Sequence, residues 1–356
     1  MMQARNLNEM LAIRLPILQA PMAGTSTPAM AAAVSEAGGL GALGLGAATV
    51  EAVAQAIRDT QERTSRAFNV NFFCHAPRPP DPAGDRVWID RAAPLFQGFG
   101  ARPPAELHDI YDSFRSHDRL LGMVLELRPR VVSFHFGLPQ PHQIAAMRAA
   151  GLILMASATS LDEARQIRDA GLDAVIAQGW EAGGHRGIFD PAAPDARLSA
   201  EDLTRALVRE IPLPVIAAGG IMDGGDIGRA LSWGAQAAQL GTAFVGCPES
   251  AADAAYRARL SQGGETVMTP VISGRPARCL SNSFTDWGAG ITADAVAAYP
   301  RAYDLGKALN AAARAAGQTG YGAQWSGMGA SRARAMPVSR LMAALADELA
   351  AFRSAP

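Results

Sequence analysis

The chain has 356 residues, of which 49% are hydrophobic and 18% are charged, and its 32 basic and 33 acidic residues leave a net charge of −1. This balance excludes a disordered chain, which combines high charge with low hydrophobicity, and it argues against a protein that coats nucleic acid through a basic surface. The length suits two domains, or one barrel that carries an insertion. Glycine is frequent, with 36 residues.

The three cysteines, Cys74, Cys247 and Cys279, form no C-x-x-C pair, so the sequence predicts neither a disulfide framework nor a structural zinc site. The first residues lack the pattern of a signal peptide, and no apolar run reaches the roughly 18 residues that a membrane helix needs. We therefore expect a soluble, cytoplasmic protein that binds no membrane and no nucleic acid.

Short apolar runs alternate with helical patterns along most of the chain. Strands are predicted at 17–22, 41–45, 68–73, 131–136, 152–157, 174–178, 214–218 and 237–244, and helices at 27–37, 49–63, 140–150, 160–170, 200–210, 225–233 and 338–353. The strands are apolar throughout rather than alternating, which is typical of a parallel sheet covered on both faces. Eight such strands with intervening helices predict an α/β fold, a (β/α)8 TIM barrel. An open doubly wound sheet is the alternative.

Two segments interrupt this rhythm. Residues 75–118 are rich in Pro and Arg and hold no clear strand, and residues 246–317 show mostly helical patterns, at 251–261 and 293–316. We interpret 1–245 and 318–356 as the barrel, with 75–118 as an excursion from it. Residues 246–317 are then a small helical insertion over the barrel mouth, where barrel enzymes build their active sites.

Glycines follow the last two predicted strands, at Gly219, Gly220 and Gly241. Such turns leave backbone N–H groups free to approach a phosphate, and Thr242 adds a hydroxyl. We interpret these four residues as a phosphate cradle; tight turns without a ligand are the alternative.

His185 lies in the sequence EAGGHRG, flanked by glycines, where packing alone gives a histidine little reason to be. An imidazole at a barrel mouth can serve as acid, base or anion binder near neutral pH. His135 lies inside an apolar strand, so a core histidine is nearly as good an interpretation as a substrate contact. The other four histidines are expected at the surface: His75, His108, His117 and His142.

No metal site is predicted, because no ligand spacing is present. The run Gly39-Leu-Gly-Ala-Leu-Gly44 falls within a predicted strand and is discounted as a dinucleotide fingerprint. A phosphate cradle, an apolar pocket and a histidine without a metal suggest FMN. Ala20, Pro21 and Met22 could pack on the flavin ring, and Gln178 or Asn71 could hydrogen-bond its polar edge.

These segments together resemble the nitronate monooxygenases, formerly 2-nitropropane dioxygenases, and are most similar to the bacterial class I group. The matching pieces are QAPMAGTSTPAMAAAVSEAGGLGALG (19–44), NVNFF (69–73), VSFHFGLP (132–139), AQGWEAGGHRG (177–187), PVIAAGGI (214–221), QLGTAF (239–244), PES (248–250) and YPRAYDLGK (299–307). One departure is Gly327-Met328, where the family more often has Gly-Gln; it concerns a contact near the phosphate end, not the fold.

The resemblance implies an FMN-dependent TIM barrel with a helical substrate domain that oxidises alkyl nitronates, such as propionate 3-nitronate, with O2. The products are a carbonyl compound and nitrite, formed by way of an anionic flavin semiquinone. It implies His185 as the catalytic residue and substrate contacts at His135, Tyr299, Tyr303 and Lys307. The implied flavin contacts are Pro21, Met22, Asn71, Gln178, Gly183, Gly184, Gly219, Gly220, Gln239, Gly241 and Thr242. Tyr299, Tyr303 and Lys307 are spaced to share one helix face, which could line the pocket or simply pack on the barrel.

Other functions remain open at this stage. One is an NAD(P)H-dependent FMN reductase on the same barrel, acting on quinones or enoyl thioesters. A second is a non-redox barrel that binds a sugar phosphate, and a third is a flavin-binding barrel that has lost its activity. The sequence leaves both the physiological nitro compound and the choice between monomer and homodimer undetermined.

Overall fold

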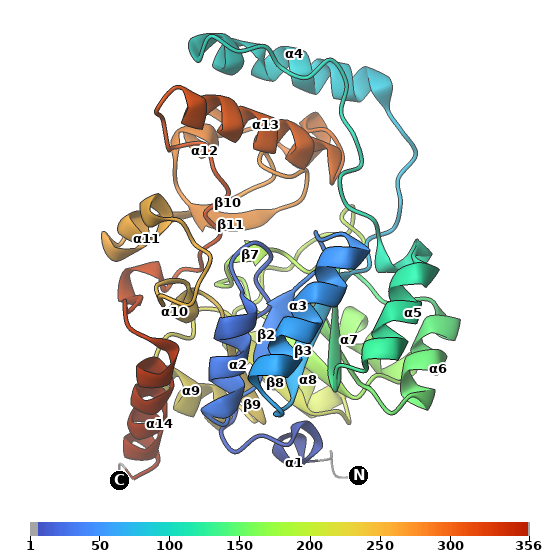
Figure 1. The fold of residues 1–356 in the computed structure, drawn as a ribbon, viewed down its shortest axis with the longest axis vertical. Coiled ribbons are helices and arrows are strands. Elements are labelled where there is room, and N and C mark those ends of the chain that lie inside the picture. The colour runs from blue at the N-terminus through green and yellow to red at the C-terminus, as the bar shows by residue number, and fades with distance from the viewer. Residues whose placement is uncertain (1–5, 355–356) are drawn as a thin grey trace.

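The computed structural model describes residues 6–354, and its lower half is a barrel of parallel strands (Figure 1). The barrel strands are β1 (Ile17–Gln19), β2 (Gly41–Gly44), β3 (Phe68–Phe73), β4 (Val131–His135), β5 (Ile153–Ala158), β6 (Ala174–Gln178), β8 (Val215–Ala218) and β9 (Ala237–Leu240). They pair in the order β1-β9-β8-β6-β5-β4-β3-β2. The two ends of this sheet meet at Leu40, whose backbone bonds to both Ile17 and Gln19. The sheet is therefore a nearly closed barrel, and the (β/α)8 prediction is confirmed.

Helices surround this barrel, and all of them except α5 lie where the sequence predicted a helix. They are α2 (Pro28–Glu36), α3 (Val50–Arg63), α5 (Asp118–Leu127), α6 (Pro141–Ala149), α7 (Leu161–Asp169), α8 (Ala200–Glu210), α9 (Gly224–Ser232) and α14 (Val338–Ser354). Thr27, Thr49, Ser160 and Ser199 precede four of them, and each side chain accepts a hydrogen bond from a backbone N–H of the first turn. These caps satisfy donors that a helix start leaves unpaired, which is why the helix starts were readable from the sequence.

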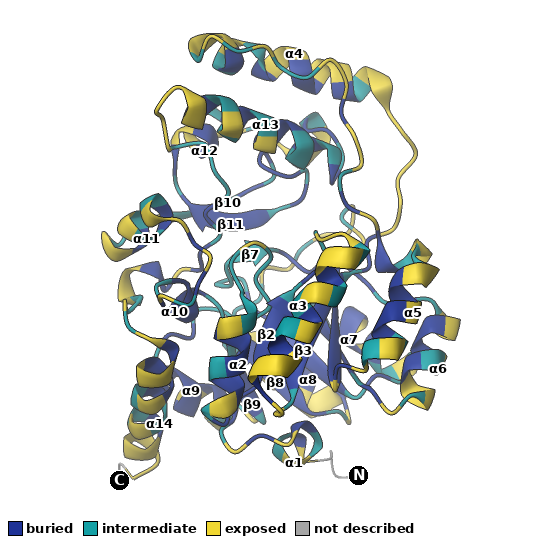
Figure 2. Ribbon diagram, in the orientation of Figure 1, coloured by how far each residue is buried: buried dark blue, intermediate teal, exposed yellow. Residues whose placement is uncertain are grey.

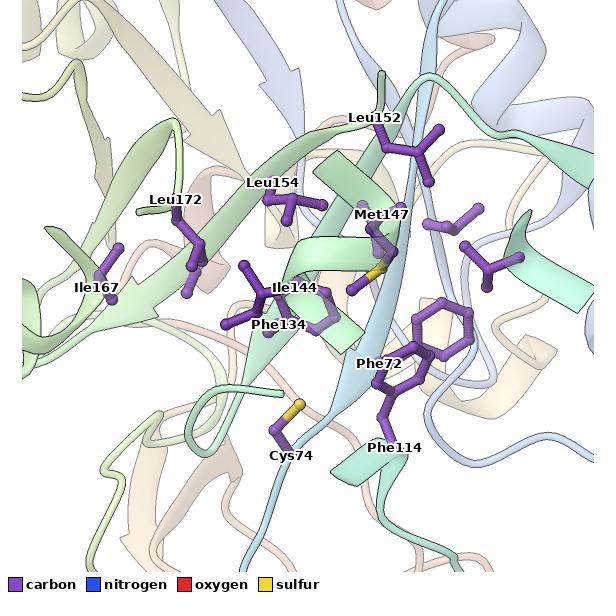
Figure 3. Packing of buried hydrophobic residues seen from close by; sticks show 14 of the residues in the cluster. Phe72, Cys74, Phe114, Phe134, Ile144, Met147, Leu152, Leu154, Ile167 and Leu172 are labelled. Atoms are coloured by element: carbon purple, nitrogen blue, oxygen red, sulfur yellow. The ribbon is translucent and has the colours of Figure 1, made fainter. Parts of the chain in front are cut away.

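Two apolar layers hold the barrel together. The short helix α1 (Leu7–Leu11) closes its base, where Leu7 and Leu11 are fully buried in one cluster with barrel residues such as Met155 and Ile216. Outside the strands, a second cluster fills the space beneath the helices, and Figure 3 shows Phe72 beside Phe114 within it. Their rings stack with centroids 5.0 Å apart. Figure 2 shows the resulting pattern, with buried strands inside helices whose outer faces are exposed.

The predicted last strand, 237–244, is too long. β9 ends at Leu240, and residues Thr242–Val245 form a short helix, α10. Because Leu240, Ala243 and Phe244 are all buried, the apolar run continues through the turn and conceals it in the sequence. The turn at Gly241 directs the following residues across the barrel mouth.

Above the barrel mouth lies a layer that combines both interrupting segments (Figure 1). The excursion supplies α4 (Pro82–Gly98) to this layer, whereas its η1 (Phe114–Ser116) packs beside α5 in the cluster around the barrel. The later segment supplies α11 (Ala254–Ser261), β10 (Thr266–Thr269), β11 (Ala277–Leu280), α12 (Ser283–Trp287), η2 (Ala293–Ala295) and α13 (Arg301–Ala315). A short helix, η3 (Ala330–Arg332), follows this segment. α4 packs on α13, and Arg301 at the start of α13 pairs with the buried Asp85 of α4 at 2.6 Å.

The helical interpretation of 246–317 is incomplete, because β10 and β11 form an antiparallel hairpin within it. A third strand, β7 (Gly184–His185), joins this hairpin from the loop after β6, with His185 opposite Ala277. Two-stranded hairpins are marginal alone, so the strand from the barrel loop helps to fix the hairpin. This small sheet ties the loop that carries His185 to the layer above the mouth.

Candidate active site

A cavity of about 380 Å³ opens at the carboxyl ends of the barrel strands, beneath the upper layer. All of the predicted site residues except Tyr299 line it: Pro21, Met22, Asn71, His135, Gln178, Gly183, Gly184, His185, Gly219, Gly220, Gln239, Gly241, Thr242, Tyr303 and Lys307. They come from six of the eight barrel strands or the loops that follow them, and from α13. A parallel barrel gathers such residues because all its strands end at one rim.

The cavity has a glycine-lined side after β6, β8 and β9. Gly219 and Gly220 adopt φ of 126° and 70°, which only glycine adopts without strain. A Cβ on Gly183 would lie 2.4 Å from the backbone nitrogen of Gly327, and that nitrogen donates to the Thr242 hydroxyl at 2.9 Å. Three segments that are far apart in the sequence, at Gly183, Thr242 and Gly327, are therefore in direct contact here.

Two amides offer polar atoms to this cavity. The Gln239 Oε1 atom is buried and has no hydrogen-bond partner among residues 6–354. A buried acceptor without a partner is rare, so it points to a ligand donor in the cavity. The Asn71 Nδ2 atom, by contrast, donates to the Ser133 hydroxyl at 2.9 Å, and the neighbouring Asn69 donates to the same oxygen.

Met328 departs from the usual family residue, but its side chain lies outside this cavity. It is 56% exposed, while its neighbours Gly327 and Gly329 line the cavity. Its backbone N–H donates to the Glu181 carbonyl at 3.0 Å, which any residue at this position could do. Having Met328 in place of the usual family residue therefore changes the protein surface and does not change the side chains that line the cavity.

His185 is held through its ring and through its backbone. Its Nε2 lies 2.8 Å from the Ser273 hydroxyl. Its carbonyl accepts from Gln178 Nε2 at 2.9 Å and from His135 Nε2 at 3.1 Å. The Gln178 Oε1 in turn accepts from the Gly187 N–H at 2.7 Å, so the Gln178 amide bonds to the loop at both His185 and Gly187. Gln178 and His135 thus fix the backbone from which His185 projects.

Both histidines are neutral at physiological pH. Burial lowers the pKa of His185 to about 3, with smaller contributions from His135 and the Arg275 charge. Burial also lowers the pKa of His135 to about 4, although its bond to the His185 carbonyl opposes this. Both values lie well below the ordinary histidine pKa of about 6.5. Both imidazoles are therefore in the neutral form near pH 7.

Aromatic rings enclose the His185 imidazole. The centroids of Trp325, Phe136, Tyr299 and Tyr303 lie 4.8, 5.5, 5.8 and 6.2 Å from it. These rings exclude water from the imidazole, which is the physical cause of its lowered pKa.

Lys307, an exposed residue of α13, places a cationic side chain at the upper wall of this cavity. Its Nζ lies 4.8 Å from the centroid of Tyr111 and 5.6 Å from that of Tyr303. Partial burial lowers its pKa from the ordinary value. An ammonium held against two aromatic faces can attract an anion into the cavity.

Comparisons with known proteins agree with this geometry. The family model described as nitronate monooxygenase matches residues 4–348. The chain belongs to this family. A nitronate monooxygenase of Paraburkholderia phytofirmans is 54% identical over 97% of this chain and 95% of its own length, and one of Pseudomonas aeruginosa is 48% identical over 96% and 97%.

Two solved structures are similar to this chain over nearly its whole length. A nitroalkane oxidase from Streptomyces ansochromogenes is 39% identical, with a TM-score of 0.90 over 98% of this chain and 99% of that one. FabK from Thermotoga maritima is 28% identical, with a TM-score of 0.73 over 99% and 98%. As a member of the nitronate monooxygenase family, the chain is a flavin-dependent oxidoreductase.

Two sequence-based expectations about this family member are wrong. Tyr299 lies before α13 begins at Arg301, so it does not share a helix face with Tyr303 and Lys307, and it lines a different cavity. His75, expected at the surface, is buried with 6% exposure and packs edge-on against Tyr299.

Several residues of the site gave no signal in the sequence. Ser273 and Trp325 lie in irregular segments without a motif, and Tyr111 lies in the excursion. Arg186 was readable in part, because it follows His185 in the glycine-rich motif. It is 1% exposed, pairs with Asp195 at 2.9 Å and donates to the carbonyls after β6.

Two further features concern what the described residues contain. Across residues 6–354, no group of three or more His, Cys, Asp or Glu side chains could hold a metal ion. Within that same part of the chain, no helix has the length and apolar character needed to cross a membrane.

Proposed function

We propose that this enzyme uses FMN and O2 to oxidise alkyl nitronates, with propionate 3-nitronate as an example, to a carbonyl compound and nitrite. The observation that carries the proposal is a neutral, half-buried His185 in a cavity that joins the glycine-lined side to the Tyr303 and Lys307 side. The named relatives and the nitroalkane oxidase structure support the choice of substrate.

The lining fits a flavin mononucleotide. The backbone turns at Gly219, Gly220 and Gly241, with the Thr242 hydroxyl, would hold the phosphate, and the partnerless Gln239 Oε1 would accept a hydrogen bond from the group. Pro21 and Met22 offer apolar contact. When bound, the flavin supplies the electron acceptor that takes electrons from the nitronate and passes them to O2.

The chain's own residues would bind and orient the substrate. A nitronate is a small anion, and Lys307 offsets its charge while the rings of Tyr303 and Trp325 exclude water. If Ser273 accepts the proton of His185 Nε2 and donates its own to the Arg275 carbonyl 3.2 Å away, Nδ1 of His185 keeps its lone pair. That nitrogen is then the one available to a substrate.

The low pKa of His185 bears on substrate choice. A neutral nitroalkane must first lose an α-proton, and an imidazole whose pKa is lowered to about 3 is a weak base for that task. A nitronate has already lost the proton. The environment of His185 therefore favours nitronates over neutral nitroalkanes.

The proposal is tested by anaerobic titration of the flavin-loaded enzyme with propionate 3-nitronate. We expect absorbance changes of one-electron flavin reduction, followed by nitrite release when O2 is admitted. Rapid bleaching by NADH with no response to the nitronate would overturn the proposal and favour an NAD(P)H-dependent FMN reductase acting on quinones or enoyl thioesters.

A variant pair sharpens this test. His185→Asn should lower kcat/KM for the nitronate by several orders of magnitude, while His142→Asn, at an exposed position on α6, should leave it unchanged. Full activity in His185→Asn would remove the catalytic role.

A further inference from the structure

A second cavity, of about 260 Å³, lies on the far side of Tyr299 from the active site, and we call it the Arg275 cavity. Its lining includes His75, Arg78, Asp190, Gly274, Arg275 and Tyr299. The Tyr299 ring separates the two cavities, because its centroid lies 5.8 Å from that of His185 on one side and 5.1 Å from that of His75 on the other. The nitronate chemistry proposed above makes no use of this space.

Arg275 is a buried cation without a counter-ion. Its side chain is in a residue only 5% exposed, and no carboxylate lies within 4.0 Å of it among residues 6–354. Of its five N–H donors, the bond found within that range is from Nη1 to the Ile188 carbonyl at 2.8 Å. Leaving a buried charge without a partner costs several kcal/mol. A negatively charged group beside Arg275 would therefore stabilise the folded protein.

The backbone presents this guanidinium in a fixed place. Gly274 adopts a φ of +86°, and a Cβ there would lie 2.5 Å from the Ala297 carbonyl oxygen. Its N–H donates to the Pro270 carbonyl at 2.8 Å. One face of the guanidinium lies 4.3 Å from the centroid of the Phe136 ring. The N–H groups at the edge of the guanidinium that make no hydrogen bond within residues 6–354 are therefore available to the cavity.

The other charged groups near the cavity do not neutralise Arg275. Asp190 and Arg78 are both exposed and of opposite sign, so their contributions oppose each other. Glu163 accepts from Thr159 and Phe189 through its two oxygens. Burial lowers the pKa of His75 to about 4, so this ring is neutral near pH 7. Glu163 and Asp190 moderate the charge of Arg275 from a distance, but neither pairs with its guanidinium, whose remaining N–H donors are left at the cavity.

We propose that the Arg275 cavity binds one small monovalent anion, of the size of nitrite, nitrate or chloride, with the Arg275 guanidinium as its main partner. The volume lies just below the range of about 300–1,000 Å³ that is usual for organic ligands, which favours a compact occupant. An anion here would offset the positive charge that helps to keep His75 and His185 unprotonated. Nitrite from the proposed reaction and inorganic anions from solution share this chemistry.

The direct test is a crystal of the flavin-loaded enzyme soaked in sodium bromide, with data collected at the bromine absorption edge. We expect an anomalous peak within hydrogen-bond distance of the Arg275 guanidinium. Ordered water alone at that place, with bromide found elsewhere or nowhere, would overturn the proposal. This measurement needs no variant and does not depend on the reaction.

A solution test uses thermal unfolding of the flavin-loaded enzyme against sodium nitrate, with ionic strength held constant by sodium gluconate, whose anion is larger than those proposed for the site. We expect Tm to rise and then saturate, as for binding to one site. Arg275→Gln should abolish the saturating part, whereas Arg278→Gln should keep it, because the Arg278 guanidinium donates to the Trp180 carbonyl instead. A saturating rise of equal size in Arg275→Gln, or none in the unaltered enzyme, would refute the site.

Repeating the titration with nitrite, nitrate and chloride distinguishes the sources of the anion. Tighter binding of nitrite would assign the site to the product, and similar affinities would assign it to anions of the solution. Because this measurement involves no turnover, it stands even where the proposed nitronate oxidation fails.

Discussion

Three histidines with lowered pKa values should make the stability of this protein steeply dependent on acid. His75 and His135 have pKa values lowered to about 4, and His185 to about 3, each mainly by burial. In the unfolded chain these rings bind protons near pH 6.5, while in the folded chain they do not. The unfolded state therefore binds more protons as the pH falls below 6.5, and folding stability declines until the folded pKa values are reached.

The size of the effect follows from these values. At pH 5 each histidine lowers the free energy of unfolding by about 2 kcal/mol relative to pH 7.5, so the three together lower it by about 6 kcal/mol. Domains of ordinary stability unfold with about 5–15 kcal/mol. The three groups alone can therefore remove a large share of the total between pH 6.5 and about 4.

The assay is urea unfolding of the flavin-loaded protein at several pH values, followed by tryptophan fluorescence. His75→Gln removes one titrating group outside the proposed active site and should reduce the slope by about 1 kcal/mol per pH unit between pH 6 and 4.5. His142→Gln is the matched control, since that side chain is 65% exposed and should leave the slope unchanged. An identical slope in His75→Gln and the unaltered protein would refute the reasoning.

Three further predictions concern single residues. Arg186→Met breaks the buried pair with Asp195 and should lower the free energy of unfolding by about 3–5 kcal/mol in urea. Gly183→Ala places a Cβ 2.4 Å from the Gly327 nitrogen, and should weaken flavin binding at least about tenfold, measured by the fluorescence of released flavin. Lys307→Met should raise KM for propionate 3-nitronate by about 10–100-fold and KM for ethyl nitronate less, because propionate 3-nitronate carries a second negative charge, on its carboxylate, that Lys307 also offsets.

Each of these has a control in the chain. Arg205→Met removes an exposed pair with Glu201 and should change stability by less than about 1 kcal/mol. Gly122→Ala adds a Cβ with nothing within 4 Å and should leave flavin binding intact. Equal losses in a variant and its control, or equal KM changes for both nitronates in Lys307→Met, would contradict the corresponding reasoning.

The barrel and much of its rim could be read from the sequence. The apolar runs of β3 and β6 matched their predicted bounds, because a strand buried on both faces leaves an uninterrupted apolar signal. Helix starts such as Thr49 were readable because a cap acts on the next few residues alone. His185 and the glycines at the strand ends gathered around one cavity because a parallel barrel places all its carboxyl ends together.

Other features depend on contacts between distant segments, which no local pattern encodes. The β7–β10–β11 sheet pairs His185 with Ala277, 92 residues later in the chain, and the same fold brings Ser273 to the imidazole. The apolar run through Gly241 hid the end of β9, since burial continues through the turn.

The sequence by itself therefore determined the barrel and the set of residues at its mouth, because these follow from periodicity, caps and strand ends. Only the tertiary structure decided the chemical state of those residues. Four aromatic rings from three segments enclose His185 and keep it neutral, and the turn before α13 places the Tyr299 ring between the two cavities rather than on the active-site wall. The same fold leaves Arg275 beside that ring with no carboxylate within 4.0 Å among residues 6–354. Desolvation and charge pairing are sums over all neighbours in space, so they exist only once the chain has folded.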